Sequence, residues 1–416
     1  MKIRVSINVS TATRFILGRD RMELLIKGAR IVDENKDFTG DLYIKDGKIK
    51  DYGVKIDYSC ERINGEGLVL MPSFIDLHAH FREPGFTHKE DLLSGSKAAL
   101  RGGYTLVNLM GNTNPISSSM DIVEYVLGRA RELDLIDIHQ VVSVTKDFDG
   151  ITLDHLDDLD ERVKFISDDG VGIQSNIVMY NAMKKSIEGG LTIMVHAEDK
   201  DLTPIDYRIS ENIITFRDIY LSKVTGARLH LCHVSTAEAI EEIRRAKKDG
   251  INLTCEVTPH HISLWDNNYK VNPPIRTKRD VDSIIEGIMD GTVDAIATDH
   301  APHTKDDKLN GSPGLSGLET SFSVSYTSLV KTGNIDLMKL SRLMSGNPAR
   351  IMGVKKGRIE KGYDGDLVLA DLDKELVVEG EKFYSKGKNT PFEGMKFYGE
   401  IIMTLKSGKI KYPFGD

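Results

Sequence analysis

Two histidines and an arginine stand at the end of the apolar stretch "LVLMPSFIDLHAHFREPG", at positions 78, 80 and 82. Alternate residues of a strand point to the same side, so His78 and His80 would face one site. Imidazole nitrogen is a common ligand of zinc and related divalent metals. The pair alone is weak evidence, because two hydrogen-bonded histidines inside a protein would give the same pattern.

Similar polar residues end three other short apolar stretches: His196 in "MVHAED", His233 in "LCHVS" and Asp299 in "ATDHAPH". Burying such groups together is unfavourable unless a metal or another partner compensates for the lost water. Five ligands are too many for one tetrahedral zinc and suit two divalent ions about 3.5–4 Å apart. A two-metal site also needs a bridging ligand. A lysine ammonium has no lone pair for this purpose, whereas a lysine carbamylated by CO2 would supply a carboxylate.

The elements that must position these residues alternate along the middle of the chain. Short β-branched stretches are separated by helix-like segments such as "TAEAIEEIRRAKKDG". Eight strands alternating with helices predict a (β/α)8 barrel, in which functional groups sit at the carboxyl ends of the strands. A doubly wound open sheet is the alternative, but it predicts no polar residue at the end of nearly every strand. The eight stretches are "SFIDLHAH", "YTLVNLMGNT", "DIHQVVSVT", "RVKFISDD", "LTIMVHAED", "RLHLCHVS", "NLTCEVTPHH" and "DAIATDHAPH".

Both ends of the chain have a different sequence pattern, in which short strand-like segments are joined by Gly-Asp and Asp-Gly turns. We expect residues 22–70 and 354–416 to form one small β-sandwich domain beside a barrel of residues 71–353. The basic segment 1–21 is expected to be an extension or a flexible arm, because its apolar run is too short for a secretory signal.

The composition excludes several classes of function. The net charge of the 416 residues is −8, which does not favour nucleic acid or an anionic membrane as a partner. No apolar stretch approaches the roughly 18 residues of a membrane span. The three cysteines cannot all pair and form no CxxC motif, which indicates a reducing, cytoplasmic location. Only two glutamines occur among many lysines and glutamates, a composition that leans towards a thermophilic source.

Seven motifs together resemble the dihydroorotase family of the cyclic amidohydrolase superfamily, over most of the chain from about residue 22. Hydantoinases and allantoinases are similar in their histidines and remain the alternative. The arginine of "HFREPG" and the "DHAPH" segment are typical of dihydroorotases. The motifs are "DLHAHFREPG", "VHAED", "CHVS", "CEVTPHH", "NPPIR", "TDHAPHT" and "PGLSGLET".

The resemblance implies two Zn²⁺ ions per chain and a sixth ligand that bridges them. Lys164, 32 residues before His196, resembles the carbamylated lysine of the family and is the favoured candidate. The following "SDDGVG" resembles relatives that use an aspartate instead, so Asp168 and Asp169 are alternatives, and Lys146 is a weaker one. The implied metal ligands are His78, His80, Lys164, His196, His233 and Asp299.

The resemblance also implies a group of substrate-binding residues. A guanidinium is suited to a carboxylate substrate, because it forms paired, charge-assisted hydrogen bonds. Arg82, Asn112 and His303 would bind the substrate α-carboxylate. Asn272 and Arg276 would form a second group, and Pro313 and Gly314 would contact the ligand by backbone from a loop.

The implied reaction is the reversible cyclisation of N-carbamoyl-L-aspartate to L-dihydroorotate in pyrimidine biosynthesis. A metal-bound hydroxide would attack in the hydrolytic direction, with Asp299 as the catalytic proton carrier. Association with aspartate carbamoyltransferase is a further expectation. An inactive barrel that serves as a scaffold is the alternative from another class, and the presence of every ligand histidine argues against it.

Overall fold

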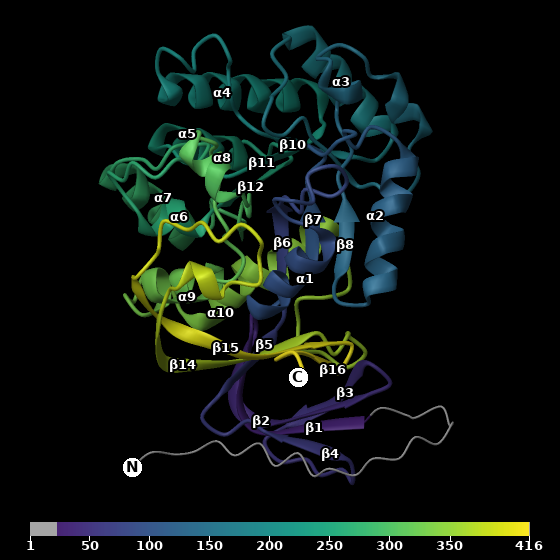
Figure 1. Cartoon of the computed structure of the whole chain (residues 1–416), viewed down its shortest axis with the longest axis vertical. Helices are drawn as coiled ribbons and strands as arrows, with labels where there is room; N and C mark the ends of the chain where they lie inside the picture. Colours follow the sequence, from purple (N-terminus) through teal and green to yellow (C-terminus); the bar gives the residue numbers. More distant parts are fainter. Residues whose placement is uncertain (1–22, 416) are drawn as a thin grey trace.

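Eight parallel strands form the centre of the protein in the computed structural model, which describes residues 23–415 (Figure 1). The predicted arm of residues 1–21 lies outside the described residues. Neighbouring strands pair in chain order in two sheets. The strands are β6 (Phe74–Ala79), β7 (Tyr104–Leu109), β8 (Asp137–Gln140), β9 (Phe165–Ile166), β10 (Thr192–Val195), β11 (Arg228–Leu231), β12 (Leu253–Val257) and β13 (Ala295–Ile296).

Two parallel bridges close these sheets into a barrel. Val142 pairs with Ile166 and joins β8 to β9, while Ala79 pairs with His300 and joins β6 to the residues after β13. The predicted (β/α)8 barrel is therefore confirmed, and each of the eight predicted stretches contains one strand. The main outer helices are α1 (Leu92–Arg101), α2 (Met120–Leu133), α3 (Asn176–Glu188), α4 (Tyr207–Thr225), α5 (Ala237–Lys248) and α7 (Lys278–Asp290).

Shorter helices complete the barrel at both ends. After β12 comes α6 (Pro259–Ser263), and α8 (Lys305–Leu309) follows β13. The chain then runs through α9 (Ser321–Ser325), a π-helical turn (Tyr326–Val330), α10 (Leu337–Ser341), a second π-helical turn (Arg342–Gly346) and α11 (Asn347–Met352). Met352 of α11 belongs to the apolar cluster that fills the barrel interior with Ile75, Leu106 and Phe165. The barrel is thus a packed core closed by α11 at the amino ends of its strands.

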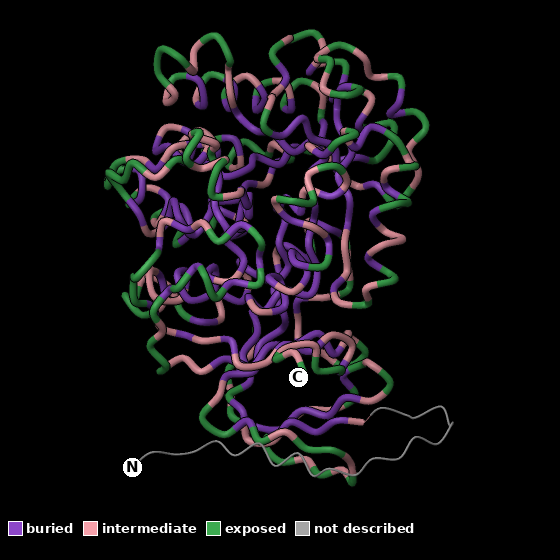
Figure 2. Tube along the Cα trace, viewed as in Figure 1, coloured by how far each residue is buried: buried purple, intermediate pink, exposed green. Residues whose placement is uncertain are grey.

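A third sheet combines strands from both chain ends, as predicted for the small β-sandwich. Its order is β16-β15-β14-β5-β1-β2-β3, and β4 pairs with β1. The sheet surrounds its own buried apolar cluster, which includes Ile26, Leu42 and Leu369 (Figure 2). The strands are β1 (Glu23–Asp33), β2 (Lys36–Lys45), β3 (Lys48–Gly53), β4 (Glu61–Asn64), β5 (Val69–Pro72), β14 (Leu367–Val377), β15 (Lys396–Lys406) and β16 (Lys409–Tyr412).

The segment between β14 and β15 leaves this sheet and lies against the barrel. Ser385 Oγ bonds Glu90, and the backbone N–H of Ser316 donates to Asn389 O over 2.8 Å. Part of residues 354–416 thus packs on barrel residues. The predicted domain boundaries at residues 70 and 354 stay a prediction.

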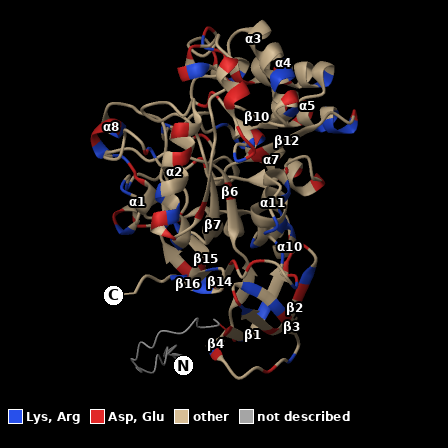
Figure 3. Cartoon of the chain, turned by 90° about the vertical axis from the view of Figure 1, so that its right-hand side faces the viewer, with Lys and Arg blue, Asp and Glu red and all other residues tan. Residues whose placement is uncertain are grey.

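Charged residues of both signs are mixed along the outer helices and the sheet (Figure 3). Within residues 23–415, no helix has the length and apolar character that a membrane crossing would require.

Candidate metal centre

Six side chains meet at the carboxyl ends of the barrel strands. His78 and His80 come from β6 and the residue after it, and the other four follow β9, β10, β11 and β13 within three residues of each strand end. All six residues are buried. They are His78, His80, Asp169, His196, His233 and Asp299.

Asp169 lies at the centre of this group. Its Oδ1 is 3.4 Å from His78 Nε2, 3.4 Å from His196 Nδ1 and 3.7 Å from His233 Nε2. Its Oδ2 is 3.5 Å from His80 Nε2. One carboxylate therefore faces all four histidines, which is the position of a bridging ligand.

Asp299 completes the side of the group formed by β6. Its Oδ1 is 3.3 Å from His80 Nε2 and 3.6 Å from His78 Nε2. On the opposite side, His196 Nδ1 and His233 Nε2 are 3.0 Å apart. The six side chains thus form two ligand groups that share Asp169.

These separations fit a metal better than hydrogen bonds. Ligand atoms about 2.0–2.1 Å from a tetrahedral zinc are about 3.4 Å from one another, which is close to the spacings around Asp169. His78 Nε2 and Asp169 Oδ1 are buried and have no hydrogen-bond partner in the described part of the chain. Buried polar atoms are rarely left this way, so the pair fits a site that takes a cation.

Hydrogen bonds outside the group fix the ring orientation of three histidines. His78 Nδ1 donates to Glu256 Oε1 over 2.9 Å, and His80 Nδ1 donates to Asn112 Oδ1 over 2.8 Å. His196 Nε2 donates to Glu198 Oε2 over 2.8 Å. Each ring therefore turns its other nitrogen towards the centre, as metal-binding histidines do.

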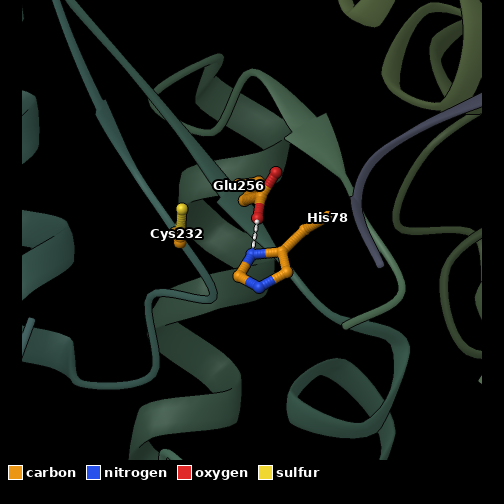
Figure 4. A group of neighbouring side chains, drawn as sticks. All are labelled: His78, Cys232 and Glu256. Atoms are coloured by element: carbon orange, nitrogen blue, oxygen red, sulfur yellow. Dashed lines mark hydrogen bonds and ion pairs between the residues drawn. The ribbon is translucent and has the colours of Figure 1, made fainter. Parts of the chain in front are cut away.

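Figure 4 shows the arrangement beneath His78: one ring nitrogen meets Glu256, and the other points away from it. Cys232 lies beside them and could join a metal-binding group with His78 and Glu256. Burial raises the pKa of the Cys232 thiol well above its usual range, so the thiol stays protonated. Because Glu256 already holds one nitrogen of His78, we interpret this group as support for the main centre.

The charges of the site balance one another across short distances. Burial alone would raise the pKa of Asp169, but the imidazoles of His78, His196 and His233 hold it well below its usual range. For His196 burial acts in the opposite direction and would lower the pKa, but Asp169 and Glu198 raise it to about 9. The carboxylates are therefore ionised, and a bound cation would take the place of protons on the imidazoles.

The prediction that Lys164 bridges the metals is wrong for this structure. Strand β9 is Phe165–Ile166, so Lys164 precedes it and Asp169 follows it. The Lys164 ammonium donates to Met352 O over 2.9 Å, in the helix that closes the opposite end of the barrel. The alternative Asp169 lies among the four histidines instead.

The other candidates for the bridge are also placed elsewhere. Asp168 accepts the backbone N–H groups of Val144 (2.7 Å) and Thr145 (3.0 Å) and so holds the loop after β8. Lys146 begins a short 3₁₀ turn and is exposed.

A cavity of about 230 Å³ opens directly over the ligand group. Most of the predicted substrate-binding residues line it. Arg82 reaches His303, with Nη2 3.3 Å from His303 Nε2, and burial together with Arg82 lowers the pKa of His303 to about 3. An arginine beside a neutral histidine is a site for an anionic group. The predicted residues that line the cavity are Arg82, Asn112, Asn272, His303, Pro313 and Gly314.

Two predicted substrate residues have other partners. Arg276 bonds Glu211 (2.8 Å) and Ser235 (2.9 Å) and does not line this cavity. The backbone of Gly314 is engaged within its loop, where its N–H donates to Lys270 O and its carbonyl accepts from Asn389. A Cβ at Gly314 would lie 2.4 Å from Ala301 O, so this contact requires glycine.

Three residues of the site adopt backbone angles that side chains other than glycine rarely take. The φ angle is +61° at Arg82, +35° at His233 and +47° at Asp299. Such conformations are unfavourable and persist where the surrounding structure imposes them, commonly at functional sites.

Sequence reasoning did not identify Glu256 and Glu198, which orient His78 and His196. Each of these glutamates could have been found from its place in the sequence. Glu256 is a carboxylate inside the apolar strand "LTCEV", and Glu198 follows His196 by two residues. His260, in the "CEVTPHH" motif, is not one of the six side chains of this group. Both of its ring nitrogens are buried without a hydrogen-bond partner among residues 23–415.

The chain has relatives among known proteins. The family model described as "Amidohydrolase family" matches residues 69–411, and the chain therefore belongs to the amidohydrolase family. A dihydroorotase from Clostridium botulinum is 57% identical over 94% of this chain and 100% of its own length. One from Caldanaerobacter subterraneus is 41% identical over 94% and 97%. Within the amidohydrolases the chain thus groups with the dihydroorotases, as the motifs indicated.

The fold has solved counterparts. The L-hydantoinase from Arthrobacter aurescens superposes with a TM-score of 0.83 and is 24% identical over 93% of this chain and 95% of its own. At that identity the likeness concerns the fold alone.

Proposed function

We propose that this chain catalyses the reversible cyclisation of N-carbamoyl-L-aspartate to L-dihydroorotate. The observation that carries the proposal is the placement of Arg82 in the cavity wall above six converging metal-ligand side chains. Both proposed substrates carry a carboxylate that a guanidinium would bind. The relatives named dihydroorotase support the same reaction.

The proposed cofactor is a pair of Zn²⁺ ions. His78, His80 and Asp299 would hold one ion, His196 and His233 the other, and Asp169 would bridge them. Zinc, when bound, lowers the pKa of water from 15.7 towards about 7, which makes hydroxide available at neutral pH. The carbamate expected on Lys164 is not part of this proposal.

Asp299 is the proposed proton carrier. Burial would raise the pKa of this carboxyl, but His80 and His78 hold it well below its usual range, so it is ionised at neutral pH. In the hydrolytic direction the carboxylate takes the proton of the attacking water and passes it to the ring nitrogen that leaves. In the biosynthetic direction the same carboxylate removes a proton from the attacking amide nitrogen and passes it to the hydroxyl group that leaves the carboxyl carbon, which departs as water.

The remaining cavity residues hold the substrate. Arg82 and His303 face the carboxylate, and Asn112 keeps His80 turned towards the centre while it lines the cavity. Asn272 donates to Glu198 over 3.0 Å, which keeps that carboxylate in place to orient His196. The cavity walls therefore fix the substrate and the ligand rings together.

The test compares dihydroorotate, hydantoin and allantoin as substrates of the metal-loaded protein. We expect turnover of dihydroorotate at least tenfold above the other two, and a preference for hydantoin or allantoin would overturn the assignment. Asp299→Asn should retain the fold by circular dichroism and lose nearly all turnover. Turnover above about a tenth of the parent would rule out Asp299 as the proton carrier.

Metal content provides a separate check. Two zinc ions per chain are expected by elemental analysis after purification without chelators. A value well under one would favour the inactive scaffold. Association with aspartate carbamoyltransferase remains a prediction that mixing the two proteins would test.

A further inference from the structure

A segment near the end of the chain reaches the back of the cavity walls. Residues 384–390, which we call the strap, lie between β14 and β15, leave the small sheet and run along the barrel (Figure 1). No residue of the strap lines the cavity itself. The strap instead contacts the two loops, residues 301–304 and 312–316, that carry His303 and Gly314 to the cavity wall.

Two glutamates of the barrel hold the start of the strap, and the side chains of both are buried. Glu319 accepts the backbone N–H groups of Tyr384 over 2.7 Å and of Ser385 over 3.1 Å. Glu90 accepts the hydroxyl of Ser385 and the backbone N–H of Lys386, the latter over 3.2 Å. The start of the strap is thus fixed to the barrel, and its far end is presented to the cavity loops.

Asn389, near the far end of the strap, bridges the two loops with its side-chain amide. Its Oδ1 accepts the backbone N–H of His303 over 3.2 Å, and its Nδ2 donates to the backbone carbonyl of Gly314 over 3.1 Å. An amide offers an acceptor and donors on one planar group, so a single side chain can set the separation of the two loops. The opposite orientation of the amide would place donor against donor and acceptor against acceptor.

The backbone of the strap also packs closely on the same loops. A Cβ at Gly387 would lie 2.6 Å from Pro302 Cβ and 2.8 Å from His303 N, so this approach requires glycine. The carbonyl of Gly387 accepts the hydroxyl of Ser316, and the carbonyl of Asn389 accepts the Ser316 backbone N–H over 2.8 Å. These contacts leave the Asn389 side chain little freedom to move relative to the loops.

The first loop carries the anion-binding end of the cavity. His303 Nε2 is 3.3 Å from Arg82 Nη2, and the carbonyl of Pro302 accepts from Arg82 Nε over 3.3 Å. Both contacts depend on where the backbone of residues 302 and 303 lies. Asn389 bonds that backbone at His303, so it acts on the placement of the imidazole and of the guanidinium beside it.

We propose that Asn389 is a positioning residue for substrate binding, which sets the anion-binding end of the cavity through His303 and Gly314 without touching the substrate. Its effect on binding rests on the function proposed above, whereas its effect on the loops rests on the contacts alone. Different side chains, including Glu256 and Asn112, orient the rings of the metal centre. Loss of the Asn389 amide should therefore weaken substrate binding and leave bound metal unchanged.

Hydrogen–deuterium exchange of the full chain tests the effect on the loops without any substrate. In Asn389→Ala the backbone N–H of His303 loses its acceptor and should exchange at least about tenfold faster than in the parent. The N–H groups of β10, which leads to His196, should exchange at the parent rate. Unchanged exchange at His303, or an equal acceleration in β10, would overturn the proposal.

Steady-state kinetics tests the effect on binding. One hydrogen bond of this kind changes an equilibrium by about 2–12-fold, so losing two should raise the KM for dihydroorotate at least about fivefold. We expect kcat to stay within about threefold and the zinc content to match the parent. A KM within about twofold of the parent would overturn the proposal for Asn389. A parent chain that turned over hydantoin instead would overturn the function proposed above, and the exchange experiment would still decide the role of Asn389.

Two further variants separate positioning from a general loosening of the strap. Lys388→Ala changes the neighbouring residue, whose exposed side chain bonds the Phe383 carbonyl, and should keep the parent KM and exchange rates. Gly387→Ala leaves the Asn389 amide in place but presses a methyl group against Pro302, and should raise KM with little change in kcat. A rise in KM as large in Lys388→Ala as in Asn389→Ala would contradict a specific role for Asn389.

Discussion

The two ends of the barrel contain similar kinds of residue in opposite states. At the carboxyl ends of the strands, His78 Nε2 and Asp169 Oδ1 are buried without hydrogen-bond partners in the described chain. At the amino ends, Lys164 bonds Met352 O, and Glu34 bonds both Arg350 and Arg358. The carboxyl end, which we call the mouth, therefore has buried polar atoms that can bind a ligand. The amino end, which we call the base, uses its polar groups to hold the fold together.

Strand β9 connects the two ends and shows why position decides function. Lys164 and Asp169 are five residues apart and lie at opposite ends of this strand. An ionisable residue next to a barrel strand is therefore ambiguous until the strand's limits are known. We expect substitutions at the mouth to change activity and substitutions at the base to change stability.

The largest effect is expected for Asp169→Asn, because this carboxylate faces all four histidines. Loss of an outer partner of a metal ligand commonly reduces activity or metal affinity 10–100-fold, so loss of the central carboxylate should reduce kcat more than about 100-fold. Elemental analysis should show less bound metal. The control is Lys164→Ala, whose activity should stay within about twofold of the parent. Equal losses in both variants would contradict the contrast between the two ends.

Arg82→Gln should have the next largest effect on activity. It removes the cation that faces the substrate carboxylate, and hydrogen bonds to charged groups contribute about 1.5–3 kcal/mol, or about 10–150-fold in kcat/KM. The effect should fall mainly on KM, measured by steady-state kinetics with dihydroorotate. Arg276→Gln is the matched control, because Arg276 bonds Glu211 and not the cavity. A comparable rise in KM in Arg276→Gln would mean that its role was assigned wrongly.

Much of the fold and of the residues gathered in the candidate metal centre could be predicted from the sequence. His78, His80, His196, His233 and Asp299 follow apolar stretches whose period identifies strands, and parallel strands bring their carboxyl ends together. Strand β9 is only two residues long, so its limits could not be fixed from "RVKFISDD", and Lys164 was placed at the wrong end.

Other features could not be predicted because they depend on contacts distant in sequence. Glu256 meets His78 across 178 residues, and Asn389 reaches Gly314 across 75.

At the base, Glu34→Gln should reduce stability and leave activity unchanged. Burial would raise the pKa of Glu34, but Arg350 and Arg358 hold it below its usual value, so the carboxylate is ionised. Removing the charge should lower the free energy of unfolding by about 2–3 kcal/mol, less than for a fully buried pair because the arginines are partly exposed. Urea unfolding of the parent and the variant would measure this change in the free energy of unfolding. Asp37→Asn, which breaks the exposed Arg30–Asp37 pair, should change stability by less than about 1 kcal/mol.

A smaller effect on stability than that of Glu34→Gln is expected from the protonation of His139. Its Nε2 accepts the backbone N–H of Lys164 over 3.0 Å. Burial, and then the charge of Lys164, lower the pKa of His139 to about 4 from 6.5. Because the unfolded chain binds the proton first, this histidine makes stability fall as pH drops from about 6.5 towards 4, and has no effect above that range. Between pH 7 and 5 the loss should be about 1–2 kcal/mol. In His139→Gln that part of the slope should be absent, and an unchanged slope would assign the acid sensitivity to other groups.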